Sequence, residues 1–153
     1  MRTAFLMISL IALPAAFVSH DDVPVTVIDH GRVAAAFARG APLVETGDYK
    51  IHASRREGPG VAEVHTRDTD IAYVLRGSAT LVTGGTVVEL KSIAPEELRG
   101  AAITGGETRQ LVPGDVVVIP NGVPHWFQEV DAPFLYYVVK VRQAERSTTK
   151  GAM

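Results

Sequence analysis

The sequence predicts an all-β domain, a sandwich or a barrel, with one short helix near its N-terminus. Three observations predict this class. Short β-branched or alternating runs recur at close spacing, Gly and Pro clusters separate them, and a helix-forming run comes before most of them. A parallel α/β sheet would instead alternate strands with helices, and the chain lacks that rhythm.

Composition sets the outer limits of the interpretation. The chain has 153 residues, 46% of them hydrophobic and 21% charged, which suits one globular domain with a real core. A net charge of −2 gives no sign of a nucleic-acid partner. Because there is no cysteine, disulfides, thiolate metal ligands and cysteine nucleophiles are excluded.

Residues 1–20 form a separate segment. Arg2 precedes an apolar run over 4–18, which is short for a membrane span and the right length for a signal-peptide core. We expect a signal peptide or N-terminal anchor and export to the periplasm or outside the cell; a buried helix is the alternative. No clear cleavage site follows. The folded domain is expected at 21–143, with a flexible tail at 144–153.

The N-terminal part of the domain predicts a strand at 25–29, a helix at 33–39 and a strand at 48–55. Gly40 and Pro42 end the helix. Seven further strands are predicted at 61–66, 70–75, 78–83, 86–90, 115–119, 124–129 and 134–141. Gly84-Gly85 between two of these runs predicts a hairpin.

The stretch 91–110 interrupts this rhythm. Residues 95–99 predict one helical turn, and Gly105-Gly106 is a second hairpin candidate. An excursion of this length is typical of a lid, a binding loop or an edge hairpin. We expect it to lie over or beside a cavity and to be more mobile than the strands.

Four side chains predict a metal site. Glu63 and His65 are two apart on a strand, so they project to the same face. Asp70 opens the next strand and can meet them across the ladder, and His125 begins a strand after a Pro- and Gly-rich turn. Oxygen and nitrogen ligands of this kind suit a divalent first-row metal. Taken singly, a histidine at a strand end is more often structural, and Asp70 could be a turn cap.

These residues also carry a resemblance to the cupin superfamily. The second cupin motif, G-x5-P-x-G-x2-H-x3-N, matches Gly114, Pro120, Gly122 and His125, with Glu129 at the final Asn position. The first motif, G-x5-H-x-H-x3–4-E-x6-G, matches in spacing from His65 through Asp70 to Gly77, while its leading glycine is off by one. We interpret Gly77, Gly114 and Gly122 as backbone requirements at turns.

The resemblance implies an antiparallel double-stranded β-helix, a jelly-roll barrel, with a metal inside. Carried over by position, the ligands are Glu63, His65, Asp70 and His125, where Glu63 replaces a family His and Asp70 a family Glu. Two neutral nitrogens and two carboxylates can neutralise a dication and favour Mn²⁺, Fe²⁺ or Zn²⁺.

Two basic positions are candidates for substrate binding. His52 shares a face with Lys50 on the strand 48–55 and could line the cavity mouth, or it is a surface histidine. Arg55, or its neighbour Arg56, could hold an anionic substrate; a solvated charge pair is the competing interpretation.

The strand that begins at His125 supplies two more candidates. By the period of two, Phe127 and Glu129 share the face of His125. Phe127 is therefore the aromatic residue expected to contact a ligand, and Glu129 is a candidate general base.

Three functions remain open at this point. The first is an exported metalloenzyme of the oxygenase, isomerase or cyclase type, acting on a small molecule. The second is a non-catalytic small-ligand binding or sensor domain, and the third is a barrel that serves only as a dimer module. We expect a homodimer in each case, because strands 115–119 and 134–139 leave apolar surface.

Overall fold

The computed structural model describes residues 24–143. The predicted export segment 1–20 and the predicted tail 144–153 lie outside these residues. Within 24–143, no helix is both long enough and apolar enough to cross a lipid bilayer.

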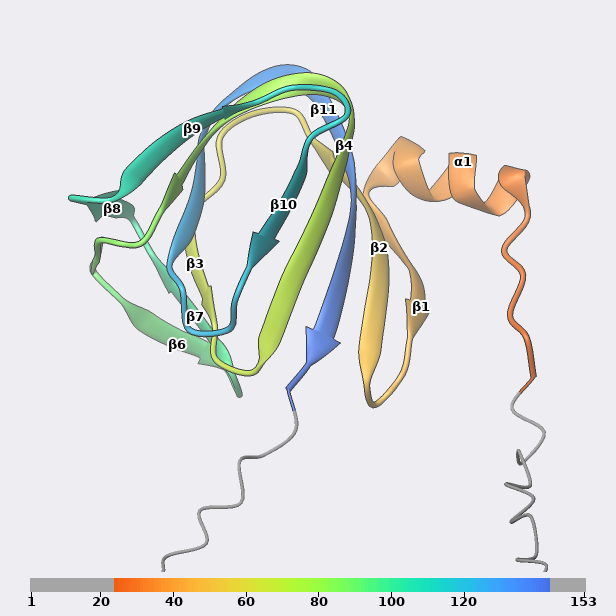
Figure 1. Cartoon of the computed structure of the whole chain (residues 1–153), viewed down its shortest axis with the longest axis horizontal. Helices are drawn as coiled ribbons and strands as arrows, with labels where there is room; N and C mark the ends of the chain where they lie inside the picture. The colour runs from red at the N-terminus through yellow and green to blue at the C-terminus, as the bar shows by residue number, and fades with distance from the viewer. Residues whose placement is uncertain (1–23, 144–153) are drawn as a thin grey trace, which may run out of the picture.

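The chain folds into antiparallel strands with one short helix, as the sequence predicted (Figure 1). In chain order the elements are α1 His30–Arg39, β1 Ala41–Glu45, β2 Tyr49–Arg56, β3 Ala62–His65, β4 Asp68–Thr83, β5 Thr86–Val88, β6 Lys91–Ala94, β7 Glu97–Gly100, β8 Ala102–Thr104, β9 Glu107–Leu111, β10 Val116–Ile119 and β11 His125–Arg142.

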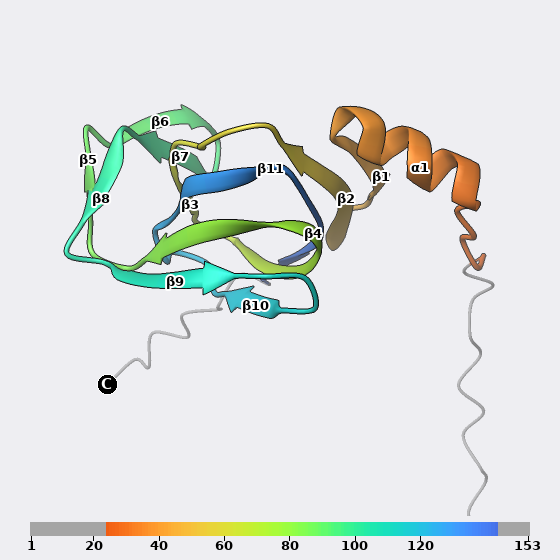
Figure 2. The same cartoon turned by 90° about the horizontal axis from the view of Figure 1, so that it is seen from above.

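Two long strands, β4 and β11, organise the sheet. β11 pairs with β2, β3 and β4, while β4 also pairs with β9 and β10, all antiparallel. β1 extends the sheet beyond β2, β7 and β6 extend it beyond β3, and β5 and β8 form a separate two-stranded sheet. The strands curve around a common interior, and α1 packs outside β2 (Figures 1 and 2). This is the jelly-roll arrangement that the resemblance implied.

The apolar core lies between β4 and β11. Phe134, Leu81 and Val74 are its largest fully buried side chains. Phe134 also stacks within an aromatic group, with ring centroids 5.6 Å from Phe127 and 5.0 Å from Tyr136. These rings give β11 a rigid inward face next to the polar cavity described below.

The helix begins earlier than predicted, and the strand predicted before it is absent. The Asp29 side chain caps α1 by accepting a hydrogen bond from the Arg32 amide at 3.0 Å, and Gly40 ends the helix at φ 67°. The predicted strand at 25–29 is wrong: these residues form no strand, and Val25 and Val27 are 91% and 81% exposed. No strand within residues 24–143 pairs with them.

β4 and β11 are each one continuous strand where the sequence predicted two shorter strands. Gly77 lies inside β4 at φ 75°, and a Cβ there would sit 2.6 Å from the carbonyl oxygen of Asp131 and 2.7 Å from that of Pro133. Only glycine fits so close to the crossing backbone. Gly114 and Gly122 also have positive φ, so the predicted backbone role of these three glycines is confirmed.

The segment 91–110 belongs to the sheets, and its first part, β6 and β7, is a hairpin at the sheet edge, one of the three structures expected for it. The chain from β6 to β9 is extended, and the helical turn predicted at 95–99 is absent because Glu96, at φ 66°, turns β6 back onto β7. Glu97 and Arg99 nevertheless reach the cavity, so the segment lies beside it. Its greater mobility stays a prediction that hydrogen exchange can test.

Both predicted Gly-Gly hairpins are also wrong. β4 pairs with β9 and β5 with β8, so neither Gly84-Gly85 nor Gly105-Gly106 joins two paired strands. The two turns lie against each other instead: a Cβ on Gly85 would meet the carbonyl oxygen of Thr104 at 2.4 Å. This close packing lets the chain leave the large sheet and return to it.

Candidate metal centre and its cavity

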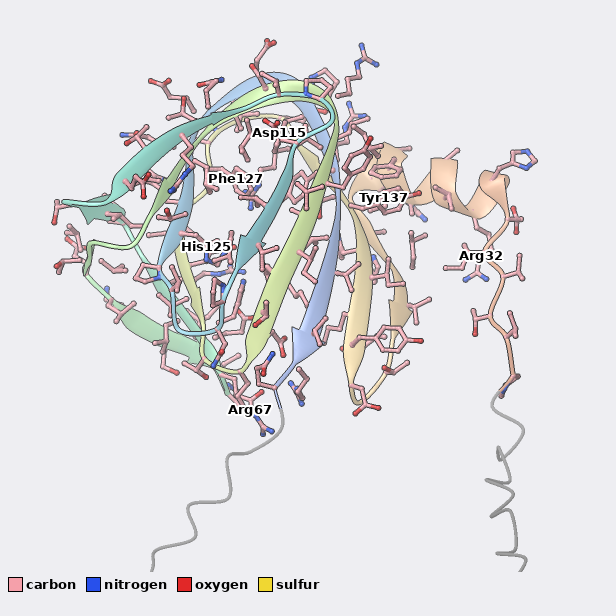
Figure 3. The ribbon with its side chains drawn as sticks, in the orientation of Figure 1. Arg32, Arg67, Asp115, His125, Phe127 and Tyr137 are labelled. Atoms are coloured by element: carbon pink, nitrogen blue, oxygen red, sulfur yellow. The ribbon has the colours of Figure 1, made fainter. Side chains whose placement is uncertain are left out.

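A cavity of about 270 Å³ opens among the inner faces of β2, β3, β4, β7 and β11. His125 and Phe127 project from β11 within the ring of strands (Figure 3). One wall is apolar, and the rest carries polar and charged groups. The lining residues are His52, Ser54, Arg56, Glu63, His65, Asp70, Ala72, Glu97, Arg99, Ile119, His125, Phe127, Tyr136, Val138 and Lys140.

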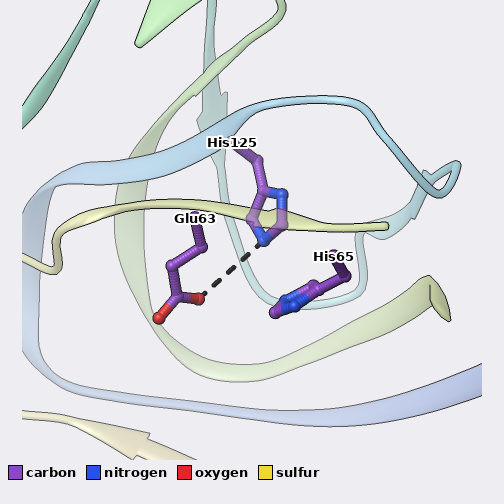
Figure 4. A group of neighbouring side chains, drawn as sticks. All are labelled: Glu63, His65 and His125. Atoms are coloured by element: carbon purple, nitrogen blue, oxygen red, sulfur yellow. Dashed lines mark ion pairs between the residues drawn. The ribbon is translucent and has the colours of Figure 1, made fainter. Parts of the chain in front are cut away.

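Three of the four predicted metal ligands converge here. Glu63, His65 and His125 each offer one ligand atom, and these atoms lie within 4.8 Å of one another (Figure 4). Glu63 and His65 come from alternate positions of β3, and His125 opens β11 directly opposite Glu63 in the ladder. The strand period and this register therefore create the group.

His125 is in the form that binds metals. Its Nδ1 lies 3.1 Å from the carbonyl oxygen of Val123, which can only accept, so Nδ1 carries the proton. The lone pair is left on Nε2, which lies 3.9 Å from Glu63 Oε2. Burial lowers the pKa of His125 and so favours the neutral ring.

Asp70 lines the same cavity but has a different partner. Lys140 Nζ lies 2.7 and 2.9 Å from its two carboxylate oxygens. The same ammonium lies 2.8 Å from His65 Nε2. The structure therefore places Asp70 beside the three-ligand group and pairs it with a cation. Lys140 was missed, although it shares the inward face of Tyr136 and Val138 in an apolar strand, which is an unusual position for lysine.

Glu97, also missed, brings a third carboxylate to the site. It lies opposite His65 in the β3–β7 ladder, with its Oε1 3.0 Å from His65 Nδ1. Even so, His65 Nδ1 and Glu97 Oε2 are buried without a hydrogen-bond partner. Sequence reasoning had assigned 95–99 to a helical turn, so the strand alternation that aims Glu97 inward could not be used.

The donor set fits a divalent metal. Two imidazoles and a carboxylate bring their ligand atoms within 4.8 Å of one another, and one imidazole has its free lone pair fixed by a backbone hydrogen bond. The orphaned buried atoms of His65 and Glu97 give a second indication, because buried polar atoms are normally satisfied.

Two guanidinium groups flank Glu63. Arg99 Nη2 lies 3.5 Å from its Oε1, and Arg56 Nη2 lies 4.0 Å from its Oε2. Arg56 is held in place by a hydrogen bond from Nε to the Tyr136 hydroxyl at 3.0 Å and by stacking over Phe127 at 4.6 Å.

The candidates on β2 divide between its two faces. His52 lines the cavity, and its Nδ1 lies 3.1 Å from Ser54 Oγ. Arg56 follows at the same period and also lines the cavity, whereas Arg55 points to the opposite face and pairs with Glu57. Alternation from His52 could have selected Arg56 over Arg55.

The candidates on β11 also separate. Phe127 lines the cavity as predicted from its face. Glu129 lies outside the cavity, where its carboxylate accepts a hydrogen bond from Thr80 Oγ1 at 3.0 Å. The β4–β11 register shifts between Phe127 and Glu129, so the period of two does not carry past this irregularity. The face predicted for the proposed general base was therefore wrong.

The fold and the site define a small antiparallel β-barrel protein with histidine and carboxylate side chains gathered in its interior. The family model described as Cupin matches residues 23–152, and the chain belongs to the cupin family. None of the curated proteins is similar enough to match this chain.

Two of the similar solved structures support the fold. BH2720 from Bacillus halodurans is 12% identical at a TM-score of 0.55, covering 81% of this chain and 86% of its own. NMB1881 from Neisseria meningitidis is 12% identical at 0.51, covering 76% and 99%. Peruvianin-I, a cysteine peptidase from Thevetia peruviana latex, is 17% identical at 0.40 over 63% of this chain, which spans only about half (52%) of its length.

Proposed function

We propose that this cupin holds one divalent metal, Mn²⁺, Fe²⁺ or Zn²⁺, at Glu63, His65 and His125 and acts on a small molecule in the same cavity. The reaction would be an oxygenation, an isomerisation or a cyclisation. The observation that carries this proposal is the convergence of three ligand atoms within 4.8 Å, inside a cavity with room for a small ligand.

A bound metal would supply Lewis acidity, polarising a carbonyl or enolate of the ligand. The chain supplies the rest. Lys140 Nζ can donate a proton from its position between Asp70 and His65. Arg56, fixed by Tyr136 and Phe127, can orient a negatively charged group. The apolar wall excludes water and strengthens these interactions.

One observation favours the alternative, a cupin that binds a small ligand without turnover. Each cavity carboxylate already faces a partner: Glu63 faces two arginines, Asp70 faces Lys140, and Glu97 faces His65. Within the described part of the cavity, this leaves the buried Glu97 Oε2 as the carboxylate oxygen without a hydrogen-bond partner, and the other two carboxylates are held by cations. A co-purifying organic ligand without a metal would support this alternative.

Elemental analysis of the purified full-length chain tests the metal site. We expect one metal per chain in the parent and in His30→Ala, an exposed helix histidine that serves as the control. His125→Ala should lose the metal and melt at a lower temperature, because a metal bound only to the native state stabilises it by mass action. Full occupancy in His125→Ala would rule out the assignment.

Export is a separate part of the proposal. It rests on the apolar run at 4–18 that follows Arg2. Fractionation of the native host should recover the chain outside the cytoplasm, and a cytoplasmic, full-length product would refute export.

A further inference from the structure

The charges of the cavity cancel without a metal. Three cationic side chains, Arg56, Arg99 and Lys140, line it together with three carboxylates, Glu63, Asp70 and Glu97. With the imidazoles neutral, the formal charge of the lining is zero. A divalent cation would therefore leave an uncompensated charge of two in a partly enclosed cavity, where unpaired charge is disfavoured.

Glu63 links this charge balance to two arginines. It is a candidate metal ligand, and it is also the carboxylate that Arg99 approaches to 3.5 Å and Arg56 to 4.0 Å. A carboxylate that binds a metal donates its electron density there, so its attraction for the guanidiniums weakens. Metal binding would thus leave two arginines facing the cavity without their present anionic partner.

The two arginines are placed to receive a ligand. Arg56 is the inner one, held by the Tyr136 hydroxyl and by the Phe127 ring, with its side chain 22% exposed. Arg99 is 48% exposed and stands toward solvent. Guanidinium groups bind carboxylates through paired N–H donors, so the inner and the outer arginine can each hold one carboxylate of a single ligand.

The apolar part of the cavity lining favours a ligand that carries a carbon chain. Ala72, Ile119, Phe127 and Val138 form an apolar surface beside the polar groups. A methylene chain can pack against this surface, whereas a compact phosphate cannot.

We propose that the cavity binds a small dicarboxylate together with the metal, and that Arg56 and Arg99 change partner from Glu63 to the dicarboxylate. This inference rests on the proposed metal site. It predicts positive coupling: each ligand raises the affinity for the other by the same factor, because linkage is reciprocal. A factor of about tenfold is typical of such coupling.

Isothermal titration of the full-length chain tests the coupling in two stages. Mn²⁺ is titrated first, alone; succinate is then titrated into the metal-free and the Mn²⁺-loaded chain. Butyrate, with one carboxylate on the same carbon chain, and inorganic phosphate are the comparison ligands. We expect succinate to bind about tenfold more tightly with Mn²⁺ present, and more tightly than butyrate or phosphate.

Arg99→Gln separates this role from a purely structural one. Without Arg99 competing for Glu63, the affinity for Mn²⁺ alone should rise or stay unchanged, while the affinity for succinate in the loaded chain should fall. Arg109→Gln is the matched control, because Arg109 is an exposed arginine paired with Glu107 outside this cavity. It should change neither affinity.

The outcomes distinguish the two proposals. Absence of Mn²⁺ binding in the first stage would overturn this inference and would remove Mn²⁺ from the metals of the proposed function, which elemental analysis tests separately. Mn²⁺ binding with an unchanged succinate affinity would overturn the coupling alone. Phosphate binding more tightly than succinate would overturn the dicarboxylate, and parallel losses of both affinities in Arg99→Gln would make that residue structural.

Discussion

Replacing Lys140 with Met should destabilise the metal-free protein by about 3 kcal/mol. The Lys140 ammonium lies 2.7 and 2.9 Å from the oxygens of Asp70, and the two side chains are only 21% and 9% exposed. At an effective dielectric constant of about 20, charges about 3 Å apart attract by about 5–6 kcal/mol before desolvation is counted.

The loss of hydration on burial offsets much of that attraction. Removing one partner does not restore the hydration of the other. Lys140→Met leaves the Asp70 carboxylate buried and unpaired, which typically costs about 3–5 kcal/mol. Because the ammonium is partly exposed, water can relieve some of the loss, so the lower end of that range is expected. Adding Asp70→Asn should restore part of the stability, since the orphaned charge is gone.

The assay is equilibrium unfolding in denaturant with a chelator present. Lys50→Met is the matched control, because Lys50 pairs with Glu45 at 2.8 Å but both side chains are well exposed, at 40% and 59%. An exposed pair of this kind contributes about 0.2–1 kcal/mol. If the two variants lose the same stability, burial does not set the strength of the Lys140–Asp70 pair and the reasoning fails.

Three further predictions follow from backbone geometry, titration and surface. Gly77→Ala should lose more stability than Gly122→Ala within a range of about 1–3 kcal/mol: both glycines have positive φ, but only a Cβ at Gly77 would collide with backbone oxygens. Equal losses in denaturant unfolding would contradict this. Burial lowers the pKa of His52 from 6.5, so the folded state disfavours its protonated form and stability should fall as the pH drops below 6.5. His52→Gln should flatten that part of the profile, and an NMR titration midpoint at or above 6.5 would refute the shift. Tyr73 and Val118 are 45% and 58% exposed on the outer face of β4 and β10, so we expect a homodimer there. Val118→Lys should give a monomer by light scattering, whereas a monomeric parent at high concentration would refute the dimer.

The fold could be predicted because local patterns and global topology agree. Alternation and turn residues indicated the antiparallel strands, and the spacing around Pro120, Gly122 and His125 carried the resemblance to cupins. Which strands pair with each other was harder to predict from the sequence. A Gly-Gly turn favours a hairpin, but at Gly84-Gly85 the chain moves to a second sheet, and the strands on either side of the turn pair with residues fourteen or more positions away. Only tertiary pairing decides this.

The site could be predicted where side chains alternate regularly between the two faces of a strand. Glu63 and His65 share a face on a regular strand, so their meeting could be foreseen. Glu129 failed because a register shift follows Phe127, and bulges leave little trace in sequence. Lys140 comes into contact with Asp70 only through long-range pairing of β11 with β4, where the two residues are partners across the ladder. The two residues are far apart in sequence, so their contact could not be predicted from local patterns.

The central claim is that a metal binds among Glu63, His65 and His125. Anomalous diffraction from crystals of the full-length chain soaked in Mn²⁺ tests it most directly. We predict a single strong peak at the convergence of these three side chains, with Lys140 still paired to Asp70. A peak elsewhere, or none at this position, would contradict the account.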